Sequence, residues 1–241
     1  DYRMPATSVI LQDRLKLSHS CVAFDISLGC SAFCYGLSVV YGMMQSGGIR
    51  KALILDGETR SKVYSPKDRR SAFLFGDGGV AALVERDEKF GKSYFSLNSD
   101  GSRADLIMIK GGGYRHPSSE ETLREKVVDE YGNIRSDEQG YMQGGDVFNF
   151  VIREIPRDIK KTLENAYIAK KMKLDTDKIP STIAKYGNTS SVSVPLTIVS
   201  ELKDRLYGNK KLLLSAFGVG MTWATGIVPF VDCKISDIVE V

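Results

Sequence analysis

Apolar positions along the chain follow two periods, which predict alternating strands and helices. Short apolar runs bounded by glycine, proline or charged residues are typical of strands, and longer runs with one apolar face are typical of helices. The predicted strands are residues 22–26, 51–58, 94–97, 106–109 and 212–217, with a further strand after a glycine turn within 73–84. The predicted helices are residues 31–44, 146–165 and 187–200. This alternation indicates an α/β fold.

The long third-quarter helix and the segment before it differ in character. Residues 146–165 place apolar side chains along one helix face, and Pro156 is expected to bend the helix or mark a boundary. That face consists of Val147, Phe148, Val151, Ile152, Ile155, Ile159 and Leu163. Residues 110–143 are polar, charged and rich in glycine, which predicts a long surface excursion and a candidate lid or interface loop.

The two halves of the chain repeat one order of elements. A small-residue helix beginning near Cys30 is followed by a basic turn and a strand, and a second such helix beginning near Asn188 is followed by the same. This repeat indicates a pseudo-twofold α/β architecture with Cys30 and Asn188 at equivalent helix starts. Because ligand chemistry in such sheets gathers at strand ends and helix N-termini, we expect a thiol and a carboxamide in one pocket.

Cys30 lies between a predicted buried strand and the N-terminus of a predicted helix. Unpaired N–H groups and the positive end of the helix dipole favour a thiolate at such a position. The same N–H groups can stabilise the oxyanion that forms when a thiolate attacks a carbonyl. A small buried hydrophobic residue fits the local pattern equally well. The pattern alone therefore leaves both roles open.

The other cysteines and the histidines do not form a metal-binding pattern. Cys21, Cys34 and Cys233 have no C-x-x-C spacing, and the histidines are His19 and His116 alone. A zinc site is therefore not expected. With four cysteines, no signal-like leader and no apolar run long enough to cross a bilayer, we expect a reducing, cytoplasmic setting and no membrane partner.

Composition narrows the range of partners. Hydrophobic residues make up 42% of the chain and charged residues 26%, which predicts an ordered protein with a large core. The net charge of +3 is too small, and the basic residues too scattered, to indicate nucleic-acid binding. A small basic patch remains compatible with an acidic protein partner or a phosphate.

Four motifs spread over the chain carry a more specific signal. They are Asp25–Phe33, Phe75–Gly78, Tyr186–Ser190 and Ala216–Trp223. Together they resemble β-ketoacyl-acyl carrier protein synthase III, a condensing enzyme of the thiolase superfamily. The resemblance implies the pseudo-twofold thiolase fold, with α/β/α/β/α layers. It assigns residues 1–88 to the remainder of an N-terminal half and residues 89–241 to a C-terminal half.

The resemblance also implies an activity. A short acyl-CoA would be joined to malonyl-acyl carrier protein by Claisen condensation through an acyl-cysteine, as in fatty acid biosynthesis. The enzyme would be a cytoplasmic homodimer that needs no metal or organic cofactor, because the substrates are themselves thioesters.

Carried over by position, the resemblance implies a set of site residues. Cys30 would be the nucleophile, and Asn188 would stabilise the enolate formed when the malonyl group loses carbon dioxide. The backbone N–H groups of Cys30 and Val219 would form the oxyanion hole, although the family usually has glycine in place of Val219. Arg69, Phe148 and Phe217 would contact the substrate. Arg69 as a surface charge and Phe148 as a core residue are the structural alternatives.

One family motif is missing from the sequence. The family's catalytic histidine lies in a His-Gln-Ala-Asn motif before the Gly-Asn-Thr-Ser motif, but here Ile168 leads directly into Ala169, and no histidine follows His116. The repeat also demands more chain before Cys30 than residues 1–17 supply. We therefore expect that segments of a longer protein are omitted. Substitution by His116 is the weaker alternative, because it lies in the polar excursion.

Two other functions stay open. An enzyme of the same superfamily could acylate Cys30 and pass the acyl group to an acceptor other than malonyl thioesters. A non-catalytic partner subunit that binds acyl chains is suggested by the absent histidine, although retention of Cys30, Asn188 and the 218–220 loop argues against it.

Overall fold

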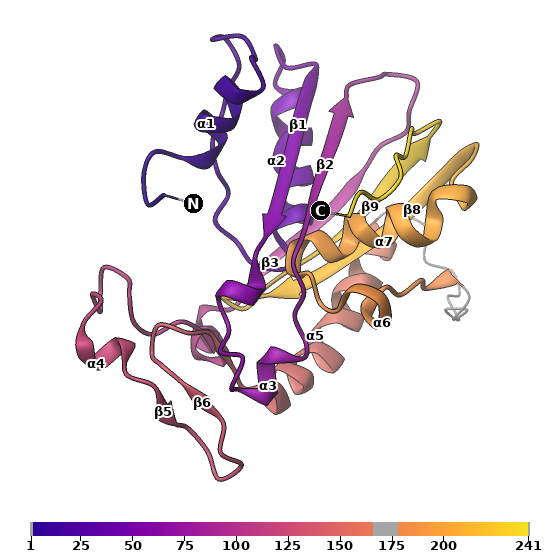
Figure 1. Cartoon of the computed structure of the whole chain (residues 1–241). Coiled ribbons are helices and arrows are strands. Elements are labelled where there is room, and N and C mark those ends of the chain that lie inside the picture. Colours follow the sequence, from indigo (N-terminus) through magenta and orange to yellow (C-terminus); the bar gives the residue numbers. More distant parts are fainter. Residues whose placement is uncertain (1, 166–177, 241) are drawn as a thin grey trace.

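Two antiparallel sheets form the body of the computed structural model, which describes residues 2–165 and 178–240 (Figure 1). The smaller sheet pairs β1 (Lys51–Glu58) with β2 (Gly78–Glu85). The larger sheet has the order β3-β9-β8 and consists of β3 (Tyr94–Ser99), β9 (Thr222–Val231) and β8 (Asn209–Gly218). The predictions of β1, β2, β3 and β8 are confirmed, whereas β9 is a strand that the sequence pattern did not indicate.

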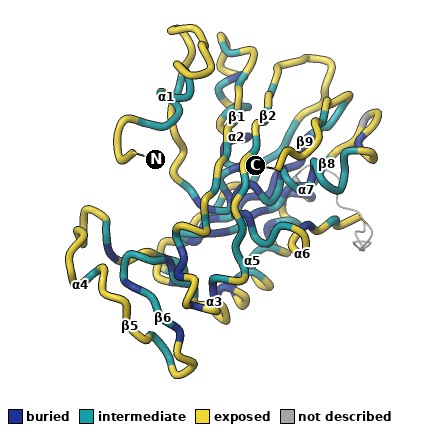
Figure 2. Tube along the Cα trace, in the orientation of Figure 1, coloured by how far each residue is buried: buried dark blue, intermediate teal, exposed yellow. Residues whose placement is uncertain are grey.

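Two helices lie between these sheets. They are α2 (Ala32–Gln45), which contacts β1, β8 and β9, and α7 (Ser193–Leu202), which contacts β8. The main core cluster joins them to the larger sheet through Phe33, Cys34, Leu37, Ile198, Leu206, Leu214, Ala216, Ala224 and Val228. Ile54 and Val84 of the smaller sheet are partly buried and pack against this cluster. Figure 2 shows the buried trace concentrated where these elements cross.

Helix α5 (Gly144–Asn165) covers the other face of the larger sheet. Val147, Phe150 and Leu163 are buried there, and Phe150 meets the Trp223 ring edge-on at 5.2 Å. The helix runs through Pro156 without ending. The predicted apolar face is wrong at Phe148 and Ile152, which are exposed, because the sheet contacts the neighbouring strip of the helix that contains Phe150.

The described residues thus form four alternating layers, in the order sheet, helices, sheet, helix. The outer face of the β1–β2 sheet carries Leu53, Leu55 and Leu83, and all three are exposed. In the register of this sheet Leu53 lies opposite Leu83, so these side chains form one apolar strip. Among the described residues no helix covers this face, which is where the fifth layer of the expected arrangement would lie.

The segment that leads to Cys30 differs from the prediction. Residues 22–26 form no strand, and Val22, Phe24 and Ile26 are exposed, so the predicted buried strand is wrong. No described strand lies beside this segment to supply ladder hydrogen bonds. Asp25 instead accepts the backbone N–H groups of Thr7 and Ser8, both at 2.8 Å, and so caps helix α1 (Thr7–Arg14).

The predicted excursion is confirmed as a lobe of short elements that projects from the body (Figure 1). It contains α4 (Glu120–Leu123), β5 (Lys126–Val127) and β6 (Ile134–Arg135), and it ends at β7 (Tyr141–Met142). Strand β7 pairs with β4 (Ile107–Met108). The remaining short helices are η1 (Arg60–Lys62), α3 (Arg69–Ala72), η2 (Gly101–Leu106), α6 (Ile183–Tyr186), η4 (Ser190–Val192) and η5 (Lys203–Arg205).

The internal repeat is visible in the element order. Helix α2 is followed by the antiparallel pair β1 and β2, and helix α7 is followed by the antiparallel pair β8 and β9. Cys30 lies just before the first helix, and Asn188 lies just before the short turn that leads into the second. The pseudo-twofold relation inferred from the sequence is therefore present in the fold.

Candidate active site

Cys30 lies in the turn just before α2, in close contact with the end of β8. A Cβ atom added to Gly218 would lie 2.8 Å from the Cys30 nitrogen, 2.9 Å from its Cβ and 3.2 Å from its Sγ. Real Cβ atoms do not make contacts this close with a backbone nitrogen. The backbone of β8 can therefore approach Cys30 only because residue 218 is glycine.

The loop after Gly218 is tied to the start of α2. The Thr222 hydroxyl donates to the Val219 carbonyl at 3.1 Å, and the Thr222 and buried Ser31 hydroxyls share a hydrogen bond of 2.7 Å. Val219 has room because its neighbour is Gly29, where an added Cβ would lie 3.0 Å from Val219 Cγ2. The β-branched side chain is thus accommodated. The oxyanion-hole role of the Cys30 and Val219 N–H groups stays a prediction.

Two of the sequence motifs meet beside this turn. Phe75 forms a parallel bridge with Asn188, in which Asn188 N–H donates to the Leu74 carbonyl at 2.7 Å and Gly76 N–H donates to the Asn188 carbonyl at 3.0 Å. At Gly76 an added Cβ would lie 2.2 Å from the carbonyl oxygen of Tyr186. Residue 76 must therefore be glycine for the bridge to form.

Gly76→Ala is accordingly expected to destabilise the fold by about 3 kcal/mol, because the backbone must move to relieve the overlap. Gly79→Ala is the matched control, since an added Cβ there meets only the Asp56 carbonyl oxygen, at 3.8 Å. Urea unfolding of both variants measures the difference. Equal losses for the two variants would show that the close approach at Gly76 is easily relieved.

Asn188 and Cys30 are linked through Ser190. The Ser190 N–H donates to Asn188 Oδ1 at 2.9 Å, and Ser190 Oγ lies in hydrogen-bond contact with Cys30 Sγ at 3.3 Å. The Asn188 amide nitrogen has no hydrogen-bond partner among the described residues, so it is free to donate to a ligand. The structure thus brings the thiol and the carboxamide into one neighbourhood, as the repeat predicts.

A partly buried charged pair, not predicted from the sequence, borders the same serine. Arg60 Nη2 donates to Ser190 Oγ at 2.8 Å and pairs with Glu58 Oε1 at 2.9 Å. Ser191 Oγ contacts Glu58 at 2.7 Å and Asp56 at 2.8 Å. Asp56 and Glu58 flank Gly57 at the end of a strand whose middle is apolar. These two acidic residues at a strand end were the signal in the sequence that could have indicated a polar site there.

The ionisation of Cys30 differs from the expectation for a helix start. Burial raises the pKa of the Cys30 thiol, and this effect outweighs the hydrogen bond from Ser190 and the charge of Arg60, which both lower it. Cys34, one turn into the helix and fully buried, has its pKa raised to about 12 by burial alone. The difference between the two thiols is that Cys30 has Ser190 and Arg60 beside it.

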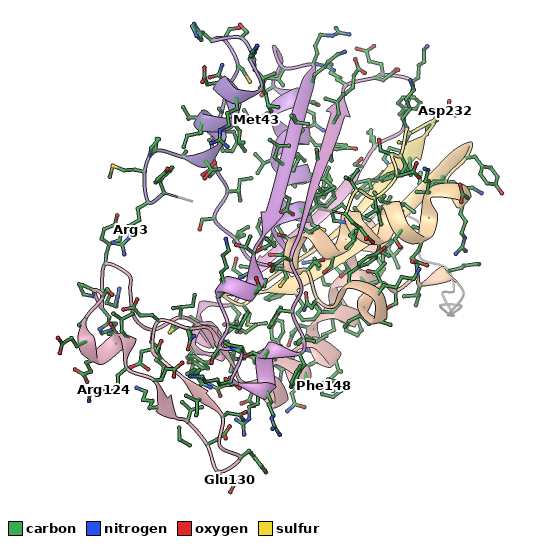
Figure 3. The ribbon with its side chains drawn as sticks, in the orientation of Figure 1. Arg3, Met43, Arg124, Glu130, Phe148 and Asp232 are labelled. Atoms are coloured by element: carbon green, nitrogen blue, oxygen red, sulfur yellow. The ribbon has the colours of Figure 1, made fainter. Side chains whose placement is uncertain are left out.

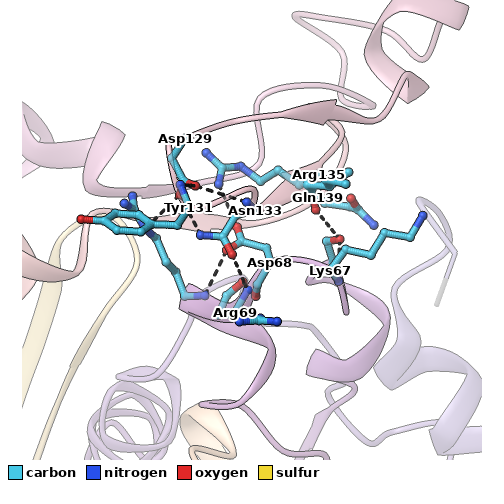
Figure 4. Close-up of polar contacts among 12 residues, drawn as sticks. Lys67, Asp68, Arg69, Asp129, Tyr131, Asn133, Arg135 and Gln139 are labelled. Atoms are coloured by element: carbon cyan, nitrogen blue, oxygen red, sulfur yellow. Dashed lines mark hydrogen bonds and ion pairs between the residues drawn. The ribbon is translucent and has the colours of Figure 1, made fainter.

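The three predicted substrate contacts fall in different surroundings. Phe217 is half-buried and packs against the cluster formed by Leu106, Val147, Phe150 and Met221. Phe148 is exposed on α5 (Figure 3), so its alternative role as a core residue is wrong. Arg69 is exposed at the start of α3, where its N–H donates to Asn133 Oδ1 of the excursion at 2.9 Å (Figure 4). Contact of these residues with a substrate stays a prediction.

The two histidines lie away from this constellation. His19 and His116 are both exposed, and neither is hydrogen-bonded or ion-paired to Cys30, Asn188 or Ser190 in the described structure. The junction of Ile168 and Ala169, where the family motif would insert, lies outside the described residues. Within residues 2–165 and 178–240, no group of three metal-binding side chains is present. No helix in that part of the chain has the length and apolar character needed to cross a bilayer.

Comparison with known families agrees with the motifs. The model of 3-oxoacyl-[acyl-carrier-protein (ACP)] synthase III matches residues 24–101, and its C-terminal counterpart matches residues 153–230. A β-ketoacyl-[acyl-carrier-protein] synthase III of Streptococcus agalactiae is 32% identical over 252 residues, covering 95% of this chain and 74% of its own length. One from Clostridium tetani is 31% identical, covering 96% of this chain and 75% of its own.

Solved structures give the same result. A 3-oxoacyl-(acyl-carrier protein) synthase from Burkholderia xenovorans superposes with a TM-score of 0.87 at 33% identity, covering 98% of this chain and 72% of its own. The chain therefore spans about three quarters of the relatives it matches. On these matches, the chain belongs to the 3-oxoacyl-[acyl-carrier-protein] synthase III family and has its thiolase fold.

Proposed function

We propose that this chain catalyses Claisen condensation of an acyl-CoA with malonyl-acyl carrier protein through an acyl-cysteine, giving a 3-oxoacyl-acyl carrier protein for fatty acid or related biosynthesis. The observation that carries the proposal is the meeting of Cys30, Gly218 and Ser190, with Asn188 holding Ser190. A thiol, a closely approaching backbone and a free amide donor are what the reaction requires.

In the first half-reaction, the Cys30 thiolate attacks the thioester carbonyl of acyl-CoA. The negative charge that develops on the carbonyl oxygen is stabilised by the backbone N–H groups of Cys30 and Val219. Collapse of this intermediate breaks the bond to the CoA sulfur, which leaves as a thiolate. The products are an acyl-Cys30 thioester and free CoA.

In the second half-reaction, the malonyl thioester loses carbon dioxide. The electron pair of the broken carbon–carbon bond forms an enolate with the thioester carbonyl. The Asn188 amide donates a hydrogen bond to the enolate oxygen, a neutral donation that needs no change of protonation. The enolate carbon then attacks the acyl carbonyl, a carbon–carbon bond forms, and Cys30 leaves as a thiolate. No metal or organic cofactor takes part in this scheme.

The proposal extends to partners and setting. Phe217 and Phe148 are assigned to the acyl and pantetheine portions of the substrate, and Arg69 to the phosphates of CoA. The protein is proposed to act as a homodimer in the cytoplasm with an acidic carrier protein as partner, and without nucleic acid or membrane. The mild positive charge of +3 is compatible with that carrier.

A second candidate function is transfer of the acyl group from Cys30 to an acceptor other than a malonyl thioester. The observation that favours it is that no histidine of the sequence lies in the site, where condensation in the family uses one. His19 and His116 are both exposed, and neither contacts the site. Acylation of Cys30 needs no histidine in the scheme above, so this candidate keeps the first half-reaction and changes the second. A partner subunit without catalysis would lose both.

One experiment on the unmutated chain separates these functions. The protein is incubated with acetyl-CoA, and its intact mass is followed; labelled malonyl-acyl carrier protein is then added, and released carbon dioxide is counted. We expect one acetyl mass on the peptide that contains Cys30, followed by carbon dioxide release. Acylation without carbon dioxide release would support transfer to another acceptor, and absence of both signals would leave the non-catalytic subunit.

A further inference from the structure

We propose that Arg60 is a positioning residue that acts on Cys30 through the Ser190 hydroxyl, forming a relay that stabilises the Cys30 thiolate. The inference deepens the proposed function, because it rests on Cys30 being the nucleophile. It concerns how the thiol is activated in a site whose described residues include no histidine.

The geometry of the relay consists of two consecutive contacts. Arg60 Nη2 lies 2.8 Å from Ser190 Oγ, and Ser190 Oγ lies 3.3 Å from Cys30 Sγ. The Arg60 side chain is only 16% exposed, although it carries a full charge. A charge held this far from water acts on its neighbours with little screening.

The direction of each hydrogen bond follows from the chemistry of the groups. A guanidinium can only donate, so Ser190 Oγ is the acceptor in its contact with Arg60. A thiolate can only accept, so once Cys30 is ionised the single hydroxyl hydrogen of Ser190 must point to Cys30 Sγ. Donation from a cation makes that hydroxyl a stronger donor, and the hydrogen bond to the thiolate is therefore charge-assisted.

Ser190 and Arg60 are both held in place by further contacts. Ser190 has a φ of 57°, in the left-handed region that side chains other than glycine rarely adopt, and its N–H is fixed by Asn188 Oδ1. Arg60 is held by Glu58 at 2.9 Å. A serine in an unfavourable backbone conformation, aligned between a cation and a thiol, is consistent with a functional rather than a packing role.

Other charged and titratable groups around Cys30 act against the relay or are farther along the network. Burial is the largest effect on the pKa of Cys30 and raises it; the hydrogen bond from Ser190 and the charge of Arg60 lower it, and Glu58 raises it. Buried Tyr64 also faces the site, and burial raises the pKa of its hydroxyl. Asp56 lies beyond Ser191, and burial raises its pKa as well.

The test is the pH profile of Cys30 alkylation by iodoacetamide, read from the mass of the Cys30 peptide so that other cysteines do not interfere. Arg60→Gln is expected to slow alkylation near neutral pH by about tenfold and to move the profile to higher pH. The limiting rate at high pH should be unchanged, because the thiolate itself is equally accessible. Arg60→Lys, which keeps the positive charge and can still donate a hydrogen bond, should recover part of the rate.

Lys62→Gln is the matched control, because Lys62 is an exposed cation in the same short helix as Arg60. It should leave the profile unmoved. If Arg60→Gln behaves like Lys62→Gln, the proposal is wrong. A purely structural role for Arg60 would lower the free energy of unfolding and the limiting rate without moving the profile along the pH axis.

A double variant tests whether Arg60 acts through Ser190. Ser190→Ala alone should also move the profile to higher pH, and an unmoved profile in this single variant would overturn the proposal even if Arg60→Gln failed to fold. Adding Arg60→Gln to Ser190→Ala should cause a smaller change than Arg60→Gln causes alone, because only the direct charge effect of Arg60 is left to lose. A full additional tenfold loss would mean that Arg60 acts directly through space, and the relay would be excluded.

Failure of the relay is distinguishable from failure of the proposed function. Acylation of Cys30 by acetyl-CoA with an unmoved alkylation profile in Arg60→Gln would refute the relay and leave the proposed function intact. A moved profile without any acylation by acetyl-CoA would support the relay and refute the proposed function.

Discussion

Cys30→Ala is expected to abolish acyl-enzyme formation completely. The unmutated chain should gain one acetyl mass from acetyl-CoA, and the variant should gain none, because its side chain has no nucleophilic atom. The free thiols in the described structure are Cys21, Cys30, Cys34 and Cys233. Only Cys30 among them contacts both Ser190 and the end of β8, so no other thiol is placed to take the acyl group.

Cys34→Ala is the matched control for this experiment. Cys34 lies in the first turn of α2, just after Cys30, is fully buried and has a pKa raised to about 12, so it should carry no acyl group. Cys34→Ala should lose some stability through its packing in the core cluster but keep the acetyl mass. Acetyl mass retained in Cys30→Ala, or lost only in Cys34→Ala, would refute the assignment of the nucleophile. Intact-mass and peptide-mass measurements decide this directly.

Asn188→Ala is expected to slow release of carbon dioxide from malonyl-acyl carrier protein by a factor of about 10²–10³. The reason is that the amide stabilises a charge that exists only after Cys30 has been acylated. Acylation by acetyl-CoA should therefore remain close to that of the unmutated chain. Acyl mass and carbon dioxide release, measured on the same sample, separate the two half-reactions.

The variant also removes a structural contact, since Asn188 Oδ1 accepts the Ser190 N–H. Loss of such a side-chain-to-backbone hydrogen bond costs about 1 kcal/mol. Asn188→Ser separates the two roles, because a serine hydroxyl can also accept the N–H two residues on but lacks the amide donor. Both variants should lose carbon dioxide release, and only Asn188→Ala should lose stability. If Asn188→Ser restores release, the residue acts only by holding the Ser190 N–H, and the proposed enolate contact is refuted.

Features encoded locally were predictable from the sequence. Helix α2 and strands β1 and β2 follow from apolar periodicity and glycine boundaries, and the structure confirms them within a few residues. The proximity of Cys30 and Asn188 was also predictable, because the repeated element order places both at equivalent helix starts.

Features that depend on distant partners were not predictable. Residues 22–26 have the alternation of a strand, but a strand needs a neighbour, and among the described residues this segment has none. Strand β9 contains Gly226 and Pro229, which argue against a strand locally, yet pairing with β3 and β8 on its two sides overrides them. From the sequence, Arg60 is interpreted as a surface cation in a basic turn. Its contact with the site is visible only in the structure, where it donates a hydrogen bond to Ser190, 130 residues later in the chain.

The contact between Cys30 and Ser190 joins positions 160 residues apart in the chain. Closing so long a loop costs conformational entropy that the contact itself must offset. Contacts of this kind therefore tend to form after the local helices and hairpins. The raised pKa of the Cys30 thiol is therefore expected to appear only when both halves have docked. Pulsed alkylation during refolding would then report completion of the native state as a fall in Cys30 labelling.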